Sequence, residues 1–206
     1  MIKVYGSFRT RAFRVLWLLE EIGVKYEHID VSFADGEHLS EEFLKLNPAA
    51  KVPVLMVDDV VYHETSMMLY MLADKYGKGT ALELAADDSK YKILQWLFYG
   101  ADELEQGLWT AARHKFALPK ERRIKEAIDW GFYEFEKALD YLSTMLGDKT
   151  YLVAESFSIA DIQISQILMW AVSQQKLDLK YDNVRAYHKR ARSREGFKKT
   201  VALARS

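Results

Sequence analysis

The feature that most constrains the fold is a change of hydrophobic periodicity after Gly77. Up to that point, short alternating stretches typical of strands are separated by stretches with the period of a helix, in the order β-α-β-α-β-β-α. Beyond it the strand signals almost vanish and long helical patterns follow. This order predicts an α/β domain with a mixed sheet over residues 1–78, a linker over 79–86, and an all-helical domain over 87–206.

Composition excludes several classes of function. The chain of 206 residues carries 29 basic and 30 acidic side chains, a formal net charge of −1, which argues against nucleic acid or an anionic membrane surface as the main partner. The absence of cysteine excludes disulfides, thiolate metal sites and cysteine nucleophiles, and the five histidines lack metal-binding spacings. With no apolar stretch long enough for a signal peptide or a membrane span, the sequence predicts a soluble, cytoplasmic protein without a metal.

Pro53 stands at the head of a predicted strand, in the stretch KVPVL. Proline has no N–H, so it can only begin a strand or lie at an edge. The simpler interpretation is a trans proline that begins the strand. The alternative is a cis bond, which occurs mostly before proline and in tight turns. A bent backbone would then expose the N–H and C=O of Val52 for antiparallel pairing with an extended peptide ligand.

Glu64 and Thr65 lie where a predicted strand gives way to a helix. Thr65 or Ser66 can simply cap that helix. The alternative is a binding site, because the free N–H groups and positive dipole of a helix N-terminus bind a carboxylate. A neighbouring acid would bind an ammonium group, so together they would recognise the α-amino-acid end of a ligand.

With these residues in place, the chain resembles the cytosolic glutathione transferases along essentially its whole length. In the first part the matching stretches are YGSFRTRAFRVLWLLEEIGVKYE, LNPAAKVPVL and HETSMMLYMLADKYG. In the second part they are FSIADIQISQILMWA, which begins with a Ser-x-x-Asp capping box, and YDNVRAYHKRARSREGFKKT. The helix start TRAF is similar to the SRAF-type starts of a bacterial and fungal branch. The resemblance implies the glutathione transferase fold, with a thioredoxin-like α/β N-terminal domain and an all-α C-terminal domain, and a homodimer.

The resemblance also implies a site for glutathione as co-substrate. Pro53 would be the cis-proline of the family, and Val52 would pair its backbone with the cysteinyl unit. Glu64 and Thr65 would hold the ammonium and carboxylate groups of the γ-glutamyl unit.

Three cationic or titratable residues are implied at the glycyl end of glutathione. Lys51 and His38 would approach the glycyl carboxylate, and Arg11 would assist either that carboxylate or the thiolate. The simpler alternatives are a solvated lysine at Lys51 and, at Arg11, a side chain that covers the helix face.

Catalysis in such a protein means activation of the glutathione thiol. A free thiol has a pKa of about 8.5, and lowering it by about 2 units stabilises the thiolate by about 2.7 kcal/mol. A hydroxyl donor at the start of the first helix, helped by the helix dipole, can supply much of this. Thr10 occupies the place of the branch's serine and is the preferred candidate, although it is also a natural N-cap; Ser7 and Tyr5 compete with it. Arg9 stands where another common family serine would lie, which leaves the type of activity open.

The acceptor substrate is expected over the thiol, between the two domains. The candidate residues are aromatic or cationic, and most lie on the first long helix: Phe8, Tyr99, Trp109, Arg113 and Phe116. They suggest an apolar electrophile with a polar or anionic handle, although aromatic residues at helical spacing also suit a core. Asp102 is expected to reach a neighbouring subunit's γ-glutamyl group.

The predicted function is therefore a detoxifying transfer of glutathione to a largely apolar electrophile. The alternatives are a glutathione-dependent disulfide or peroxide reductase, and a non-catalytic binding protein with the same fold.

Overall fold

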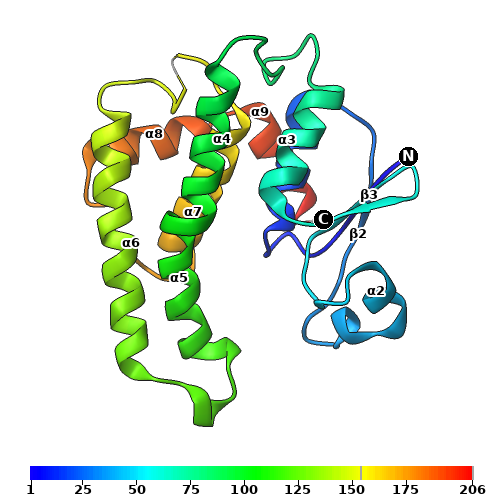
Figure 1. The fold of residues 1–206 in the computed structure, drawn as a ribbon, viewed down its shortest axis with the longest axis vertical. Coiled ribbons are helices and arrows are strands. Elements are labelled where there is room, and N and C mark those ends of the chain that lie inside the picture. The colour runs from blue at the N-terminus through cyan, green and yellow to red at the C-terminus, as the bar shows by residue number, and fades with distance from the viewer. Residues whose placement is uncertain (154, 206) are drawn as a thin grey trace. The chain divides into compact units, whose positions relative to one another are not determined.

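The computed structural model describes residues 1–153 and 155–205, which divide into two compact units. The first unit comprises Met1–Leu84 together with the segment that begins at Ser193, and the second comprises Ala85–Arg192 (Figure 1). The C-terminal segment thus belongs with the α/β unit, which differs from the all-helical domain expected over residues 87–206.

The first unit is built on a four-stranded sheet with the order β2-β1-β3-β4. Its strands are β1 (Ile2–Tyr5), β2 (Glu27–Ile29), β3 (Val54–Val57) and β4 (Val60–Tyr62). The pair β1–β2 is parallel, whereas β3 is antiparallel to both of its neighbours, so the predicted mixed sheet is confirmed. Asp58 and Asp59 both have positive φ, as the tight turn of the β3–β4 hairpin requires.

Strand β2 ends at Ile29, although the alternating pattern that is typical of a strand continues over residues 26–33. Side chains turn the chain away from the sheet directly after it. The Ser32 N–H donates to the Glu37 carboxylate at 2.7 Å, and the Ser32 hydroxyl donates to Asp35 at 2.6 Å. These local bonds compete with strand pairing.

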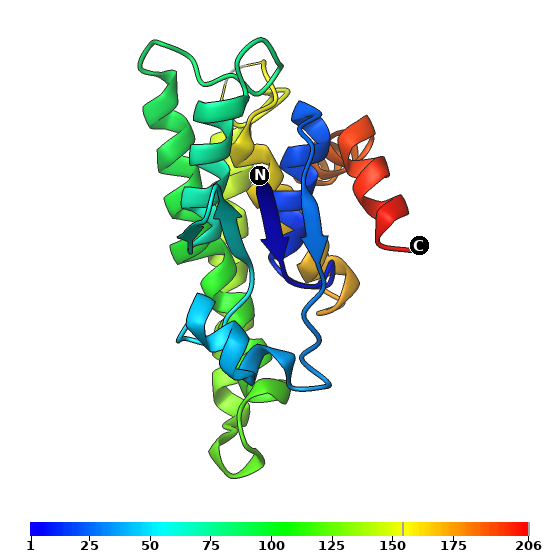
Figure 2. The same ribbon diagram turned by 90° about the vertical axis from the view of Figure 1, so that its right-hand side faces the viewer.

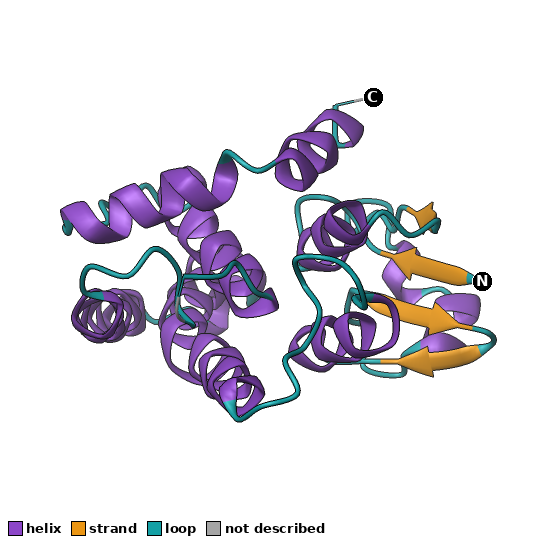
Figure 3. Ribbon diagram, turned by 90° about the horizontal axis from the view of Figure 1, so that it is seen from above, coloured by secondary structure: helices purple, strands orange, loops and turns teal. Residues whose placement is uncertain are grey.

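Helices cover the sheet of the first unit (Figure 3). Helices α1 (Ala12–Ile22) and α3 (Thr65–Tyr76) pack on each other, and α1 contacts β1. Helix α2 (Glu41–Leu46) follows a 3-10 turn over Glu37–Leu39, and its Phe43 packs with Val54 and Tyr5 of the sheet. Ser40 caps α2, since its hydroxyl accepts the Phe43 N–H at 3.2 Å.

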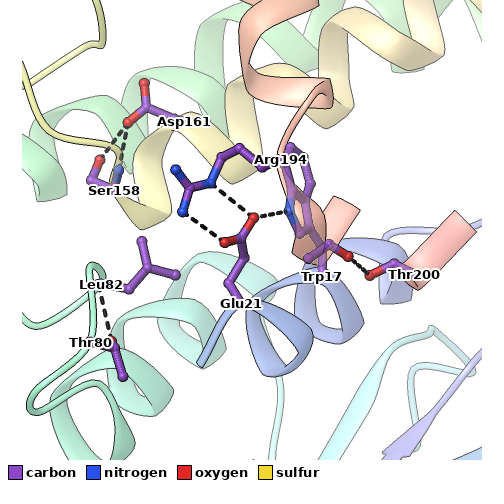
Figure 4. Close-up of polar contacts among 9 residues, drawn as sticks. Trp17, Glu21, Thr80, Leu82, Ser158, Asp161, Arg194 and Thr200 are labelled. Atoms are coloured by element: carbon purple, nitrogen blue, oxygen red, sulfur yellow. Dashed lines mark hydrogen bonds and ion pairs between the residues drawn. The ribbon is translucent and has the colours of Figure 1, made fainter. Parts of the chain in front are cut away.

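Helix α9 (Glu195–Leu203) packs along α1 and completes the first unit (Figure 2). Arg194 donates from Nε and Nη2 to the two carboxylate oxygens of Glu21, at 3.0 and 2.8 Å (Figure 4). Trp17 Nε1 also donates to Glu21, at 2.9 Å, and its ring packs edge-on against Phe197. A buried carboxylate with three donors holds this helix in one place, which is why the C-terminal segment leaves the helices that precede it.

The second unit is all-helical. Its helices are α4 (Ser89–Tyr99), α5 (Glu105–Ala112), α6 (Lys125–Leu146), α7 (Ile159–Ser173) and α8 (Asp182–Arg192). A π-helical turn over Gly100–Leu104 joins α4 to α5, and a second one over Arg113–Ala117 follows α5. Helices α4 and α5 and the two π turns thus form one continuous helical segment. Across residues 1–153 and 155–205, no helix has the length and apolar character needed to cross a membrane.

The capping box at the start of α7 is confirmed. Asp161 Oδ2 accepts from the N–H and the hydroxyl of Ser158, at 2.8 and 2.9 Å (Figure 4). Its other oxygen accepts from the Leu152 N–H and from the Tyr187 hydroxyl, both at 3.0 Å. The box therefore also ties α8 to the start of α7.

Helices α5 and α6 cross with their backbones in contact. A Cβ on Gly131 would lie 2.5 Å from the carbonyl oxygen of Gly107 and 2.8 Å from the nitrogen of Ala111. A Cβ on Gly107 would lie 2.5 Å from the carbonyl oxygen of Gly131. Backbone atoms cannot rotate away as a side chain can, so both positions require glycine.

We expect Gly131→Ala to lower the free energy of unfolding by about 1–3 kcal/mol, because the added methyl overpacks this crossing. Helix propensity alone predicts the opposite, a gain of about 1 kcal/mol. Urea unfolding followed by circular dichroism measures the change. Asp129→Ala, an exposed position of the same helix, should stay within about 0.5 kcal/mol. A Gly131→Ala protein as stable as the wild type would rule out the close crossing.

His188 is buried between α7 and α8, with 5 % of its surface exposed. Its Nδ1 lies 3.1 Å from the Ser165 hydroxyl, and its Nε2 lies 3.4 Å from Arg192 Nη1. Burial, with the positive charge of Arg192 as a second cause, lowers the pKa of His188 to about 4.

Stability should consequently fall as the pH drops from about 6.5 toward 4, because the unfolded chain takes up a proton at His188 that the folded chain does not. The full effect is on the order of 3 kcal/mol. His188→Gln should be less stable at neutral pH, and its stability should depend less on pH across this window. Lys189→Gln, exposed on the same helix, should keep the wild-type pH dependence in urea titrations. Equal slopes in wild type and His188→Gln would contradict this role.

Candidate functional site

Two chain segments meet in the first unit because β1 and β3 are antiparallel. Their register places Tyr5 opposite Val54, so the chain that leaves β1 lies beside the chain that enters β3. Gly6 follows with a φ of +137°, and a Cβ there would lie 3.0 Å from the Cβ of Ala12 and 3.1 Å from that of Val52. Glycine therefore lets the loop that carries Ser7 and Thr10 begin against Val52. The candidate thiol activators thus start beside the candidate peptide-binding backbone.

The Val52–Pro53 peptide bond is cis. The simpler interpretation, a trans proline, is therefore wrong, and the cis-proline that the resemblance implied is confirmed. The isomers of a bond before proline differ by only about 0.5–1 kcal/mol in the chain itself, so the surrounding structure decides between them.

Asn47 holds the loop that leads to Val52. It is 7 % exposed, its Nδ2 donates to the Lys51 carbonyl at 2.8 Å, and its Oδ1 accepts the Ala49 N–H at 3.0 Å. Lys51 itself is exposed and forms no ion pair with any residue that the structure describes. Sequence reasoning missed Asn47: its place before Pro48 marked a helix end, but nothing in the pattern showed that its amide reaches Lys51.

Helix α3 begins at Thr65, directly after Glu64. Glu64 has a φ of +65° and a ψ of 107°, a backbone conformation that non-glycine residues rarely adopt and that is concentrated at functional sites. Its carboxylate is exposed, whereas Thr65 is buried. The Thr65 hydroxyl accepts a hydrogen bond from Arg14 Nη1 at 3.4 Å, and no side chain at the N-cap position caps α3. A simple cap by Thr65 is therefore wrong.

The three candidate hydroxyls differ in what they can still donate to. Thr10 donates its only hydroxyl proton to the Ser7 carbonyl at 2.7 Å, and its oxygen accepts the Ala12 N–H at 3.1 Å. The Ser7 hydroxyl accepts the Arg9 N–H at 3.3 Å and bonds to nothing else in the described part of the chain. Tyr5 packs against the cluster under α2. Ser7 therefore keeps a hydroxyl proton for a ligand, and Thr10 does not.

The residues expected at the glycyl end lie in separate segments of the first unit. Arg11 is half-buried directly before α1. His38 lies in the 3-10 turn, where its ring stacks on Phe33 with centroids 4.2 Å apart. Its Nδ1 is buried and has no hydrogen-bond partner among the described residues.

Phe8 lines an open pocket of about 640 Å³ within the first unit. Its ring packs edge-on against His28 at 4.5 Å, and His28 Nε2 in turn lies 2.7 Å from the Gly6 carbonyl oxygen. The other residues that line the pocket are Leu19, Glu20, Gly23, Val24, Lys25, Tyr26 and Leu203. The structure thus places Phe8 beside the outer strand β2.

Tyr99 has a structural role in the second unit. Its hydroxyl donates to the Ala138 carbonyl of α6, and its ring lies 5.0 Å from that of Tyr141. Burial raises the pKa of Tyr99 above its usual value. This matches the alternative that aromatic residues at helical spacing belong to a core.

The other candidates of the second unit lie on or next to the π turns, a feature often found at functional sites. Arg113 and Phe116 are exposed on the second turn, Trp109 is half-buried before it, and Asp102 is exposed on the first. Arg123 fixes the second turn by donating to the carbonyl oxygens of residues 115, 116 and 118, at 3.1, 2.8 and 2.7 Å.

Known proteins match both units. The model of the glutathione S-transferase N-terminal domain matches residues 1–74, and that of the C-terminal domain matches residues 102–190. The chain is 30 % identical to glutathione S-transferase hmp2 of Hypomyces subiculosus, with all of both chains covered. The chain belongs to the glutathione S-transferase family. The predicted family is thereby confirmed.

One further relative matches this chain over part of its length, and two others are solved structures. Glutathione S-transferase 2 of Schizosaccharomyces pombe is 33 % identical over 72 % of this chain, which spans 66 % of that protein's length. Glutathione transferase URE2P8 of Phanerochaete chrysosporium, solved with oxidized glutathione, is 25 % identical with a TM-score of 0.88 over 99 % of this chain and 95 % of that one. The Pseudomonas fluorescens glutathione S-transferase is 30 % identical with a TM-score of 0.80, over 95 % and 96 % of the two chains. The predicted fold is confirmed.

Proposed function

We propose that this family member binds glutathione in its first unit and activates the thiol for transfer to an electrophilic, largely apolar acceptor. The start of α3 carries the proposal. There the exposed carboxylate of Glu64 adjoins the N–H groups at the N-terminus of α3. The carboxylate can bind the ammonium group of an α-amino acid, and the helix N-terminus can bind its carboxylate group. The γ-glutamyl unit of glutathione ends in such a group.

With the γ-glutamyl unit bound at the start of α3, the cysteinyl and glycyl units of glutathione meet other residues of the first unit. Val52, beside Gly6, offers its backbone to the cysteinyl unit. Lys51, His38 and Arg11 supply the polar partners for the glycyl carboxylate. The exposed ammonium of Lys51 and the unsatisfied Nδ1 of His38 support these two assignments.

Thiol activation is assigned to Ser7. The resemblance favours Thr10, but the Thr10 hydroxyl already donates its proton in a hydrogen bond to the Ser7 carbonyl. Among the described residues, the Ser7 hydroxyl only accepts a hydrogen bond, so it can donate to a sulfur. The thiol proton leaves to solvent, and the Ser7 O–H stabilises the thiolate. The sulfur lone pair then forms the new bond to the electrophile, whose leaving group (chloride in a chloronitrobenzene) departs with its bonding electron pair. The acceptor is proposed to contact Trp109, Arg113 and Phe116.

Ser7→Ala should raise the pKa of bound glutathione toward about 8.5, and should lower the transfer rate at pH 6.5 about tenfold for each unit of the rise. Absorbance of the thiolate against pH measures the pKa, and a chloronitrobenzene measures transfer. Thr10→Ala and Tyr5→Phe are the matched controls and should change the thiol pKa less. A thiol pKa in Ser7→Ala as low as that in the wild type would return the role to Thr10 or Tyr5. An unshifted pKa in the wild type would contradict thiol activation altogether.

A second candidate function is the reduction of disulfides by glutathione, with peroxide reduction as a related chemistry. The presence of oxidized glutathione in the similar URE2P8 structure favours this candidate. Turnover of a mixed disulfide or a hydroperoxide, without transfer to chloronitrobenzene, would select it. Glutathione binding without either activity would leave a non-catalytic binding protein.

We also propose a cytoplasmic homodimer that acts in detoxification. Helix α6 exposes Trp130, Tyr133, Tyr141 and Met145 at helical spacing, with 61, 51, 42 and 38 % of their surfaces accessible. The Trp130 and Tyr133 rings lie 5.3 Å apart. Exposed large apolar side chains that gather on one face of a helix indicate a contact surface.

Sedimentation equilibrium should show a dimer for the wild type and a monomer, or a dimer at least tenfold weaker, for Trp130→Glu, because a charge at this position opposes apolar burial. Lys120→Glu, exposed in the 3-10 turn before α6, should stay dimeric. A monomeric wild type, or a dimer that Trp130→Glu leaves intact, would contradict this interface.

A further inference from the structure

His28 of β2 reaches over to the loop that carries Ser7. In the sheet it pairs with Val4 of β1, close to the point where β1 ends. Its Nε2 lies 2.7 Å from the carbonyl oxygen of Gly6, the residue before Ser7. A carbonyl oxygen only accepts hydrogen bonds, so the proton of this bond belongs to Nε2, and His28 donates it.

Gly6 gains its orientation from β2, because glycine by itself restricts its backbone less than any other residue. Its N–H donates to the Ile29 carbonyl at 2.9 Å, which continues the pairing of β1 with β2. The bond from His28 fixes its carbonyl as well. A peptide group is planar, so the direction of the Gly6 carbonyl also sets where the nitrogen and Cα of Ser7 lie. One side chain of β2 therefore orients the peptide plane that leads into Ser7.

The same imidazole contacts the residue on the other side of Ser7. The Phe8 ring packs edge-on against it, with ring centroids 4.5 Å apart. Phe8 and His28 both line the open pocket of about 640 Å³, so the loop borders an opening there, and the contact between the two rings supports it. His28 thus holds both neighbours of Ser7, while the Ser7 hydroxyl keeps its proton for a ligand.

We propose that His28 is a positioning residue for thiol activation by Ser7. It fixes Gly6 and Phe8, and thereby holds the Ser7 hydroxyl where it can donate to the sulfur of bound glutathione. A small displacement is enough to lose this effect, because a hydrogen bond weakens steeply as its geometry departs from the optimum. The inference rests on the proposed function, in which Ser7 stabilises the thiolate, and it adds a residue that does not itself touch the ligand.

A purely structural His28 would give a different result. If it only joined β2 to β1, its loss would lower the stability of the protein and weaken glutathione binding, but the thiol pKa of the glutathione that still binds would stay as in the wild type. Positioning predicts instead a change of the thiol pKa that requires the Ser7 hydroxyl. The decisive measurement is therefore a double-mutant cycle between residues 28 and 7.

The experiment measures the thiol pKa of bound glutathione by thiolate absorbance, and kcat and KM for transfer to a chloronitrobenzene as functions of pH. His28→Leu should raise the thiol pKa by about 0.5–1 unit. Below the thiol pKa it should lower kcat about three- to tenfold, while the KM for glutathione changes less than about threefold. The pH at which kcat reaches half of its maximum should rise with the thiol pKa. In a Ser7→Ala background the same substitution should leave the thiol pKa unchanged.

Three further variants separate the contacts of His28. His28→Gln keeps an N–H donor for the Gly6 carbonyl and should restore most of the wild-type thiol pKa. Phe8→Leu removes only the ring contact and should raise the thiol pKa less than His28→Leu does. Tyr26→Phe is the matched control: it removes a hydrogen bond of 2.8 Å to Glu20 in the lining of the same pocket, and it should leave the thiol pKa and kcat unchanged.

A thiol pKa in His28→Leu equal to that of the wild type would overturn the role of His28, as would a rise that persists when Ser7→Ala is also present. If His28→Leu does not fold, an unchanged thiol pKa in Phe8→Leu decides against the proposal. A wild type whose bound thiol has an unshifted pKa, or a Ser7→Ala protein that keeps the wild-type thiol pKa, would overturn the proposed thiol activation by Ser7 itself.

Discussion

The antiparallel pairing of β1 with β3 is the constraint on which the site depends. It sets Tyr5 opposite Val54, so the end of one strand and the beginning of the other must share one edge of the sheet. Gly6 allows the two chains to touch there, because its φ of +137° would strain any other residue and a Cβ would lie only 3.0 Å from Ala12 and 3.1 Å from Val52. The loop with the candidate thiol activators and the backbone at Val52 are therefore neighbours because of strand direction, whatever their side chains are.

Helix α1 organises the rest of the first unit through two charges of opposite sign. Arg14 reaches the first residue of α3, and Glu21 binds Arg194 in front of α9. Apolar packing between helices tolerates small shifts, whereas a buried ion must meet its hydrogen-bond partners at defined distances. The two charges thus define where α3 and the C-terminal segment can lie on α1.

Much of the fold could be predicted because its signals are local. The alternation of β3 and β4, the helical period of α1, the Ser40 cap and the Ser158–Asp161 capping box each lie within a few residues of sequence, and each is present in the structure. Where a competing local interaction existed, the prediction failed. The bonds of Ser32 to Asp35 and Glu37 end β2 early, although the alternating pattern continues.

The sequence by itself determined which segments are strands and helices, the order of α/β and helical parts, and which short stretches resemble a glutathione-binding family. Only the tertiary structure decided the cis bond at Pro53, the attachment of the C-terminal segment to the first unit, the engagement of the Thr10 hydroxyl and the burial of Arg14 against Thr65. Periodicity and capping depend on neighbours along the chain. The partner of a buried polar group and the isomer of a proline bond depend on residues brought close by folding, with energy differences too small for the local sequence to decide.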